Sequence, residues 1–326
     1  MQVKPSPVFV SLVALSLIGG AQHLPSPESR TPSPGFEFTQ VHMGLPVRIV
    51  IHARDETAAR AAALIAFARI AALDRMMSDH RVDSELRRLE RRSGRYVPVS
   101  RELFDVLARA VAIAEVTGGA FDPTVGPVVA LWREARRTRV LPDRDALADA
   151  RAGVGWRLVG LDEPRTAIRL AAPGMRLDLG GIAKGYILQE ALISLRAAGI
   201  TRALIESGGD LVAGDPPPRR DGWRIAVPGA DPGFAARASR LANAALASSG
   251  ASAQFVEIDG VRYSHVVDPR SGLGVTSPRL ARVIAADGAT ADALATALTI
   301  IDTRSARVVA ARMPGVLISI DEGSSR

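Results

Sequence analysis

Apolar and polar positions follow two different periods along the chain. Apolar residues recur every three to four positions in 55–78, 100–119, 186–200 and 290–301, which predicts helices there. Short apolar runs predict strands over 47–53, 175–181, 202–210, 223–229, 245–250 and 280–287, and a hairpin over 254–268 that turns at Asp259-Gly260. Strands outnumber crossover helices in the second half, so the pattern favours an α+β fold.

The ends and gaps of this pattern are also informative. Ser100 is predicted to cap the second helix, and Gly118 lies just past its end. Residues 119–132 begin as a turn and become apolar, whereas residues 133–153 are rich in Arg and Asp and are predicted to form a surface excursion. No internal repeat or clean domain boundary is visible in the sequence.

The first 36 residues differ from the rest. Lys4 precedes an apolar run over 8–21 that is shorter than the roughly 20 residues of a membrane-spanning helix. A basic start, a short apolar core and a small-residue end predict a signal peptide over 1–21, with an N-terminal membrane anchor as the alternative. Residues 22–36 are rich in Pro and Ser and read as a flexible leader, which leaves 37–326 as the functional domain.

The composition excludes several kinds of site. The chain has 326 residues and no cysteine, so disulfides, thiolate zinc sites, cysteine nucleophiles and a Cys-anchored lipoprotein are excluded. It carries a formal net charge of +7, but Lys4 and Lys184 are its only lysines and its many arginines are scattered. Because they form no basic stripe interleaved with aromatic residues, we expect no nucleic-acid partner. We expect export to the periplasm or to the envelope side of the inner membrane.

Two glycine-rich stretches could bind an anion or a nucleotide. In 178–186 a predicted strand runs through glycines into a helix, a turn whose N–H groups favour phosphate, and Lys184 would add a charge. The alternative is a tight connection that needs glycine for its backbone conformation. In 206–211 glycine would let a ligand approach the backbone and Asp210 could bind a ribose hydroxyl or a base, although an ordinary Gly-Gly turn is the better explanation of this stretch taken alone.

A metal and a base are suggested further along. Asp292 and Thr296 are four residues apart on a predicted helix, so their oxygens share one face and suit a hard cation such as Mg²⁺. The alternative is a carboxylate favoured by the dipole of the first helical turn. His265 precedes a turn that carries Arg270, and a base beside a phosphate site is what hydroxyl attack on phosphorus needs. On a continuous strand it would share a face with Tyr263 and Val267, and a hydrogen-bonded structural role is the alternative.

Read together, these stretches resemble the ApbE-like family, the FAD:protein FMN transferases, over about Val41 to Ile301. The matching pieces occur in the family's order: HMGLPVRI, MMSDHRVDSELRRLE, TGGAFDPTVGPVVALW, LDLGGIAKGY, ALIESGGDLVAGD, ASSG, YSHVVDPRSG and ADALATAL. The resemblance implies a T-fold-like α+β architecture, with antiparallel sheets, packed helices and an FAD cleft between two halves.

The resemblance also implies roles for individual residues. Mg²⁺ would be bound by Asp292, Thr296 and the backbone carbonyl of Ala183. His265 would activate a threonine of an acceptor flavoprotein, whose hydroxyl attacks the FMN phosphate of FAD so that AMP leaves. The residues implied to contact FAD are Met43, His80, Asp178, Lys184, Gly208, Gly209, Asp210, Ser249, Gly250 and Arg270.

Several positions depart from the family pattern. Asp79-His80 stands where the family has a tyrosine able to stack on the flavin, Leu45 replaces a threonine, and Ser271 replaces another. Around residues 251–254 the usual Asp-Tyr and Arg are missing. These departures leave two alternatives to transfer, which are a periplasmic FAD-binding protein and a hydrolase that converts FAD to FMN and AMP. Membrane-associated electron-transport complexes are the acceptors that the family suggests.

Overall fold

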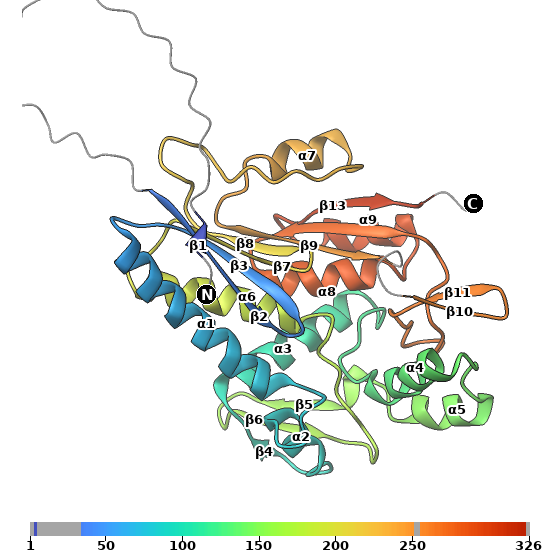
Figure 1. The fold of residues 1–326 in the computed structure, drawn as a ribbon. Helices are drawn as coiled ribbons and strands as arrows, with labels where there is room; N and C mark the ends of the chain where they lie inside the picture. The colour runs from blue at the N-terminus through green and yellow to red at the C-terminus, as the bar shows by residue number, and fades with distance from the viewer. Residues whose placement is uncertain (1–2, 5–33, 251–254, 324–326) are drawn as a thin grey trace, which may run out of the picture.

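A large antiparallel sheet forms the centre of the molecule in the computed structural model, which describes residues 3–4, 34–250 and 255–323 (Figure 1). Its strand order is β1-β2-β3-β7-β8-β9-β12-β13, and each neighbouring pair is antiparallel. The strands are β1 (Val3–Lys4), β2 (Gly35–His42), β3 (Leu45–His52), β7 (Ala203–Ser207), β8 (Asp210–Ala213), β9 (Ala244–Gly250), β12 (Leu280–Ala285) and β13 (Leu317–Asp321).

Helices cover one face of this sheet, and a loop segment that includes one short helix covers the other. Along β3 the residues Val47, Ile49 and Ile51 are fully buried on the helix side, as strand alternation requires. The helices on this side include α1 (Glu56–Met77), α6 (Ala183–Ala197), α8 (Gly288–Leu298) and, further out, α3 (Arg101–Val116). On the opposite face, α7 (Pro232–Ala238) and the segment before it pack on a second apolar cluster from β7, β8 and β9.

A smaller unit, which we call the outer wall, comprises residues 126–152 and 255–275. It contains α4 (Gly126–Thr138), α5 (Arg144–Ala152) and the hairpin of β10 (Phe255–Ile258) and β11 (Val261–Ser264), which lie together away from the large sheet (Figure 1). The unit has its own core, built on Trp132, Val256 and Val267. The indole Nε1 of Trp132 donates to the carbonyl of Gly272 at 2.8 Å, which ties α4 to the loop after the hairpin.

The remaining elements complete the helix side and the edges. They are α2 (Glu85–Glu90), a three-stranded sheet of β4 (Val97–Pro98), β6 (Ala167–Leu170) and β5 (Val159–Asp162), a short 3₁₀ helix (Trp156–Leu158) and α9 (Thr303–Ala311). The α+β class and the antiparallel sheets predicted from the sequence are therefore confirmed. The four predicted helices, the hairpin at Asp259-Gly260 and the Ser100 cap are confirmed as well, since the Ser100 hydroxyl accepts from the Leu103 N–H.

Two strand predictions are wrong. Residues 175–181 make only an isolated bridge through Arg176, because their backbone groups bond elsewhere: the Leu177 N–H donates to the Glu90 carboxylate at 2.7 Å and the Asp178 N–H to the Pro123 carbonyl at 2.8 Å. Residues 223–229 make one bridge, at Trp223, and then follow the edge of α7. The apolar side chains of both segments still pack in a core, those of 175–181 in the main core and those of 223–229 on the second apolar cluster.

The structure also adds elements that the pattern did not indicate. The predicted excursion over 133–153 is helical, formed by the end of α4 and by α5, and α5 buries none of its residues. Strand β2 begins at Gly35 and so takes the last two residues of the predicted leader. Apart from Val3–Lys4 in β1, the predicted signal peptide over 1–21 lies outside the described residues, as do the departures at Ala251, Ser252 and Gln254. Within the described residues, no helix is long and apolar enough to cross a membrane.

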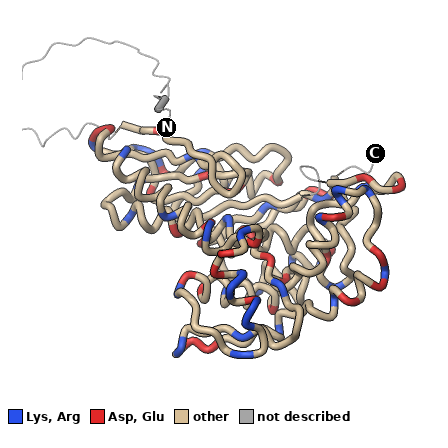
Figure 2. The backbone as a smooth tube through the Cα atoms, turned by 60° about the horizontal axis from the view of Figure 1, so that its bottom comes forward, with Lys and Arg blue, Asp and Glu red and all other residues tan. Residues whose placement is uncertain are grey.

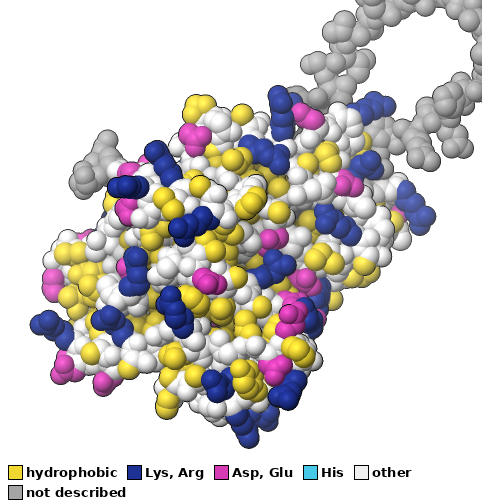
Figure 3. Space-filling view, turned by 180° about the vertical axis from the view of Figure 1, so that it is seen from behind, with side chains coloured by type: hydrophobic (Ala, Val, Ile, Leu, Met, Phe, Trp, Pro, Cys, Tyr) yellow, Lys and Arg dark blue, Asp and Glu magenta, His cyan; other side chains and the backbone are white. Residues whose placement is uncertain are grey.

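Charge is spread over the molecule as the sequence indicated. In Figure 2 basic and acidic segments alternate along the whole backbone, with no continuous basic stripe. The face seen in Figure 3 likewise mixes apolar and basic side chains. The high net charge is therefore distributed over the described part of the molecule.

Candidate active site

Two cavities meet at His265. The first, of about 370 Å³, lies between α4 on one side and the Gly180-Gly181 turn and Thr296 on the other. The second, of about 570 Å³, lies between the β2–β3 turn at Met43 and the start of α6, where Ala183 and Lys184 line it. His80, Gly180 and His265 line both cavities. Both volumes are in the range of small-molecule sites.

His265 is held by the loop that follows β11. This strand ends at Ser264, so the expectation that it continues through residue 267 is wrong, and Val266 and Val267 are both buried instead of alternating. The Ser264 N–H donates to the Val275 carbonyl at 2.7 Å, and the Val275 N–H donates to the Val266 carbonyl at 2.9 Å. These bonds fix the backbone on both sides of the half-buried imidazole.

A buried charge cluster lies behind the second cavity. The Nζ of Lys184 and the Oδ2 of Asp210 form an ion pair at 3.0 Å. The angles at this contact do not meet those of a hydrogen bond, so Oδ2 of Asp210 has no hydrogen-bond donor. Burial opposes the charge on Lys184, but the carboxylates of Asp210 and Asp292 outweigh it and hold the pKa of Lys184 above its usual value. Asp292 is only 6% exposed, and burial, reinforced by the charge on Asp210, raises its pKa to about 7.

The donors available for a cation are all oxygens. Asp292 lies in the second turn of α8 and not the first, because the helix begins at Gly288. Its Oδ2 accepts from the Gly185 N–H at 3.0 Å, while Thr296 faces the Gly181 backbone one turn further along. A carboxylate whose buried charge is only partly offset, a hydroxyl and a nearby carbonyl fit a hard cation. Among the described residues there is no group of three or more His, Asp or Glu side chains that could hold a metal ion.

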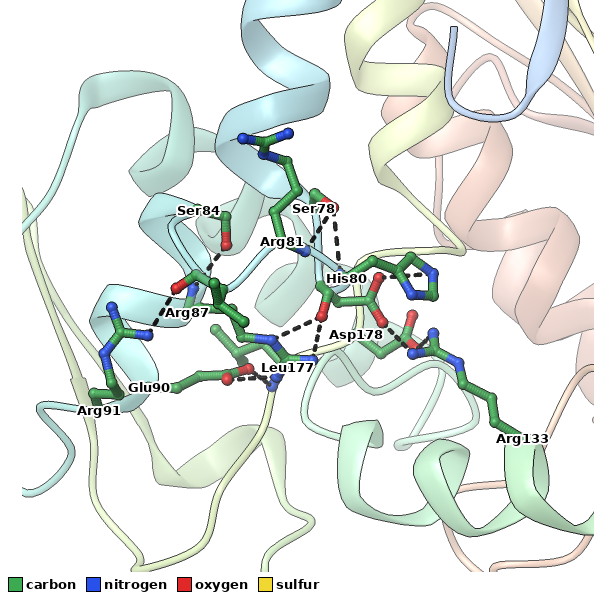
Figure 4. Close-up of polar contacts among 12 residues, drawn as sticks. Ser78, His80, Arg81, Ser84, Arg87, Glu90, Arg91, Arg133, Leu177 and Asp178 are labelled. Atoms are coloured by element: carbon green, nitrogen blue, oxygen red, sulfur yellow. Dashed lines mark hydrogen bonds and ion pairs between the residues drawn. The ribbon is translucent and has the colours of Figure 1, made fainter.

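An arginine joins the outer wall to the opposite side of the first cavity. Figure 4 shows Arg133 reaching from α4 toward Asp178, which it contacts at 3.1 Å. Arg133 also pairs with the carboxylate of Asp79 at 2.5 Å. The other oxygen of Asp79 lies 3.4 Å from His80 Nε2. Burial raises the pKa of Asp178, with the charge on Asp79 adding to it, while the Gly180 N–H and Arg133 work against the rise.

A second carboxylate, Asp122, holds the floor of the first cavity. It is 6% exposed, and its Oδ1 accepts from the N–H and the hydroxyl of Thr124 at 2.8 and 2.6 Å. Its Oδ2 accepts from the Trp156 N–H at 3.0 Å. Burial nevertheless raises the pKa of Asp122, because these bonds only partly offset the lost hydration.

Not every predicted site residue lies at these two cavities. Gly208 and Gly209 form the turn between β7 and β8 and, with Asp210, line a further cavity of about 600 Å³. Gly208 still approaches the cluster, since a Cβ there would lie 3.7 Å from Lys184 Nζ. Ser249 and Gly250 end β9 and line neither cavity at His265, and Arg270 pairs with Asp268 at 2.9 Å and faces a different hollow.

Sequence reasoning missed three charged residues that line the first cavity. Arg133 and Arg136 line the first cavity from α4, and Asp122 lines its floor. Their only signal was helical spacing, which puts Arg133 and Arg136 on one face of a helix. In a chain with this many arginines that spacing does not distinguish them from solvated residues.

Comparison with known proteins gives one consistent answer. The family model described as the ApbE family matches residues 43–319. The FAD:protein FMN transferase of Treponema pallidum (strain Nichols) is 34% identical over 261 residues, covering 74% of this chain and 71% of that protein. A protein of the same name from Klebsiella pneumoniae (strain 342) is 32% identical over 244 residues, covering 73% of each chain.

Solved structures agree with this match. The ApbE protein of Thermotoga maritima MSB8 superposes with a TM-score of 0.76 at 28% identity, covering 89% of this chain and 97% of that one. The flavin transferase ApbE from Vibrio cholerae gives a TM-score of 0.76 at 26% identity, covering 90% and 98%.

Proposed function

This chain belongs to the ApbE family and is an FAD:protein FMN transferase, and we propose that it moves FMN from FAD to a threonine hydroxyl of an acceptor flavoprotein with the help of Mg²⁺. The observation that carries this proposal is the place of His265 at the junction of two cavities. A base at such a junction can meet a nucleotide and an incoming hydroxyl together.

The two cavities suit the two parts of FAD. The first combines apolar side chains, including Phe121, Val129 and Val266, with charged ones, and this mixture fits the flat isoalloxazine ring with its polar edge. The second holds Lys184 and the start of α6, where a cation and backbone N–H groups favour the diphosphate. The phosphate of the FMN half then lies near His265, between the two.

The chemistry follows from this placement. His265 takes the proton of the acceptor threonine hydroxyl while the threonine oxygen forms a bond to the phosphorus of the FMN half. The bond from that phosphorus to the oxygen of the AMP phosphate breaks, and AMP leaves with that oxygen. A phosphoester links FMN to the acceptor, and Lys184 offsets charge on the diphosphate.

Asp292, Thr296 and the Ala183 carbonyl would hold Mg²⁺ beside this phosphate. When bound, the ion neutralises part of the charge that builds on the leaving group. The chain's own part is to keep the three oxygens together, through the Gly185–Asp292 hydrogen bond and the contact of Thr296 with Gly181.

We further propose that residues 1–21 are an export signal and that the enzyme acts on the periplasmic side. The support is the basic start, short apolar run and small-residue end of this segment.

The flavin ring would meet His80, an exposed imidazole, in place of the family's tyrosine.

The test uses purified protein, FAD, Mg²⁺ and a small FMN-binding acceptor domain. Flavin fluorescence on the denatured acceptor together with an equal amount of AMP would support transfer. AMP and FMN without a labelled acceptor would favour hydrolysis instead. FAD that stays bound with no AMP released would leave only a binding protein and contradict the proposal.

A further inference from the structure

Arg136 is a cation in the cleft that has no carboxylate at ion-pair distance among the described residues, although the charge of Asp178 is near it. It is half-buried on α4 and lines the first cavity together with His265. Among the residues that the structure describes, it makes no hydrogen bond or ion pair. Burial, helped by the nearby charge of Arg133, lowers the pKa of Arg136, and the charge of Asp178 only partly opposes this.

The other two arginines of α4 both form ion pairs with carboxylates. Arg133, one turn earlier, is held by Asp79 and Asp178. Arg137, the next residue, is exposed and pairs with Glu134 within α4. Arg136 therefore differs from both by facing the cavity with its donors still available. A half-buried guanidinium in this state favours a ligand that brings acceptor oxygens.

The position of the cavity limits what that ligand can be. Lys184 and the start of α6 line only the second cavity, so the diphosphate is expected there. Arg136 lines only the first cavity, on the far side of His265 and among apolar side chains such as Val129 and Val267. This region is where the proposed function, on which the inference rests, puts the isoalloxazine ring.

We propose that Arg136 binds the polar edge of the flavin ring. The isoalloxazine is apolar over most of its surface but carries two carbonyl oxygens and ring nitrogens along its pyrimidine edge. The planar fork of a guanidinium can donate two hydrogen bonds to such an edge. Arg136 then orients the ring, with the apolar side chains contacting its flat faces, so that the attached phosphate is presented to His265. Arg136 is thus a substrate-positioning residue supplied by the outer wall.

Binding measurements can test this assignment without relying on turnover. Wild type, R136Q, R136K and R137Q would be compared for binding of FAD, riboflavin and ADP. Riboflavin has the ring without phosphate, and ADP has the diphosphate without the ring. R137Q is the matched control, because it removes the same charge from the adjacent position of the same helix. Flavin binding is read by fluorescence, and ADP binding by competition with FAD.

We expect R136Q to bind FAD and riboflavin on the order of 10-fold more weakly, the size of one charge-assisted hydrogen bond. Its ADP affinity and melting temperature should equal those of R137Q. R136K, which keeps the charge but not the fork, should fall between R136Q and wild type. This pattern would support a contact between Arg136 and the ring.

Other patterns would overturn it. Weaker ADP binding by R136Q would place Arg136 at the diphosphate. Unchanged affinity of R136Q for both flavins would show that Arg136 does not contact the ring. If the KM for the acceptor then rises, Arg136 would be assigned to acceptor binding instead. The proposed function is tested separately, because it fails if wild type binds FAD but releases no AMP. The contact between Arg136 and the ring is measured by binding alone and does not depend on that result.

Discussion

Gly185 and Gly288 touch where α6 crosses α8, and a Cβ on either would lie 2.0 to 2.1 Å from the carbonyl oxygen of the other. No larger residue fits this crossing without moving a helix. The contact also brings the start of α6 to the face of α8 that carries Asp292, whose carboxylate accepts from the Gly185 N–H. The spacing of the proposed metal ligands therefore depends on two glycines.

Replacing Gly288 by alanine is expected to destabilise the protein and weaken Mg²⁺ binding together. Alanine alone favours a helix by up to about 1 kcal/mol over glycine, but the overlap with the Gly185 carbonyl should cost about 1–3 kcal/mol or more. Urea unfolding and Mg²⁺ titration calorimetry would measure the two effects. Gly233→Ala in α7 is the control, since its new methyl would lie an ordinary 3.5 Å from the nearest atom. Equal stability of the two variants would contradict the argument.

Lys184→Met should be more destabilising than the double variant Lys184→Met/Asp210→Asn. The single change leaves the Asp210 carboxylate, whose side chain is 3% exposed, without its cation. Such an orphaned charge typically costs about 3–5 kcal/mol, and removing the second charge should restore part of that. A double-mutant cycle of unfolding free energies checks this. Additive effects of the two single changes would show that the ion pair is not coupled.

Asp292→Asn, or chelation of Mg²⁺, should stop AMP release while FAD still binds. Loss of one unit charge about 4 Å from a cation corresponds to several kcal/mol at an effective dielectric near 20, so Mg²⁺ affinity should fall on the order of 100-fold or more. Asp287→Asn is the matched control, because Asp287 caps the same helix and asparagine caps equally well. A chelated enzyme that keeps full activity would exclude the metal role.

Stability should depend on pH through Asp122. The folded-state pKa of this carboxyl is raised by burial, so its contribution is fully present below the unfolded value near 4 and is lost as pH rises through the folded value. The free energy of unfolding of wild type minus that of Asp122→Asn should therefore fall as pH rises above about 4. Urea unfolding at a series of pH values gives the sign, and a difference that grows with pH would show that hydrogen bonding outweighs burial.

The sequence predicted the elements whose side-chain period matches their burial. Strand β3, with three fully buried residues at every second position, and α1, which Asp55 caps, are examples. It failed at residues 175–181, where Met175, Leu177 and Leu179 alternate like a buried strand and are buried. Their backbone bonds to Glu90 and Pro123, which are distant in sequence, so no local pattern indicates the difference.

The site shows the same limit. Motif spacing pointed to His265, Lys184 and Thr296, all of which line the two cavities, and to Asp292 just behind them. It did not identify Arg136, because the availability of its donors depends on which carboxylates the fold brings to Arg133 and Arg137. Which charged side chains form ion pairs depends on the residues that the fold brings together, and the sequence does not show those contacts.

The outer wall has a consequence for how such enzymes can diverge. Its core around Trp132 is separate from the core beneath the large sheet, and one face of α4 borders the cleft. Substitutions on that face can accumulate in a lineage without repacking the sheet or moving Asp292 and Lys184. Ligand preference can thus change at this face of α4 independently of Asp292 and Lys184, whereas His265, which belongs to the outer wall itself, has to keep its place.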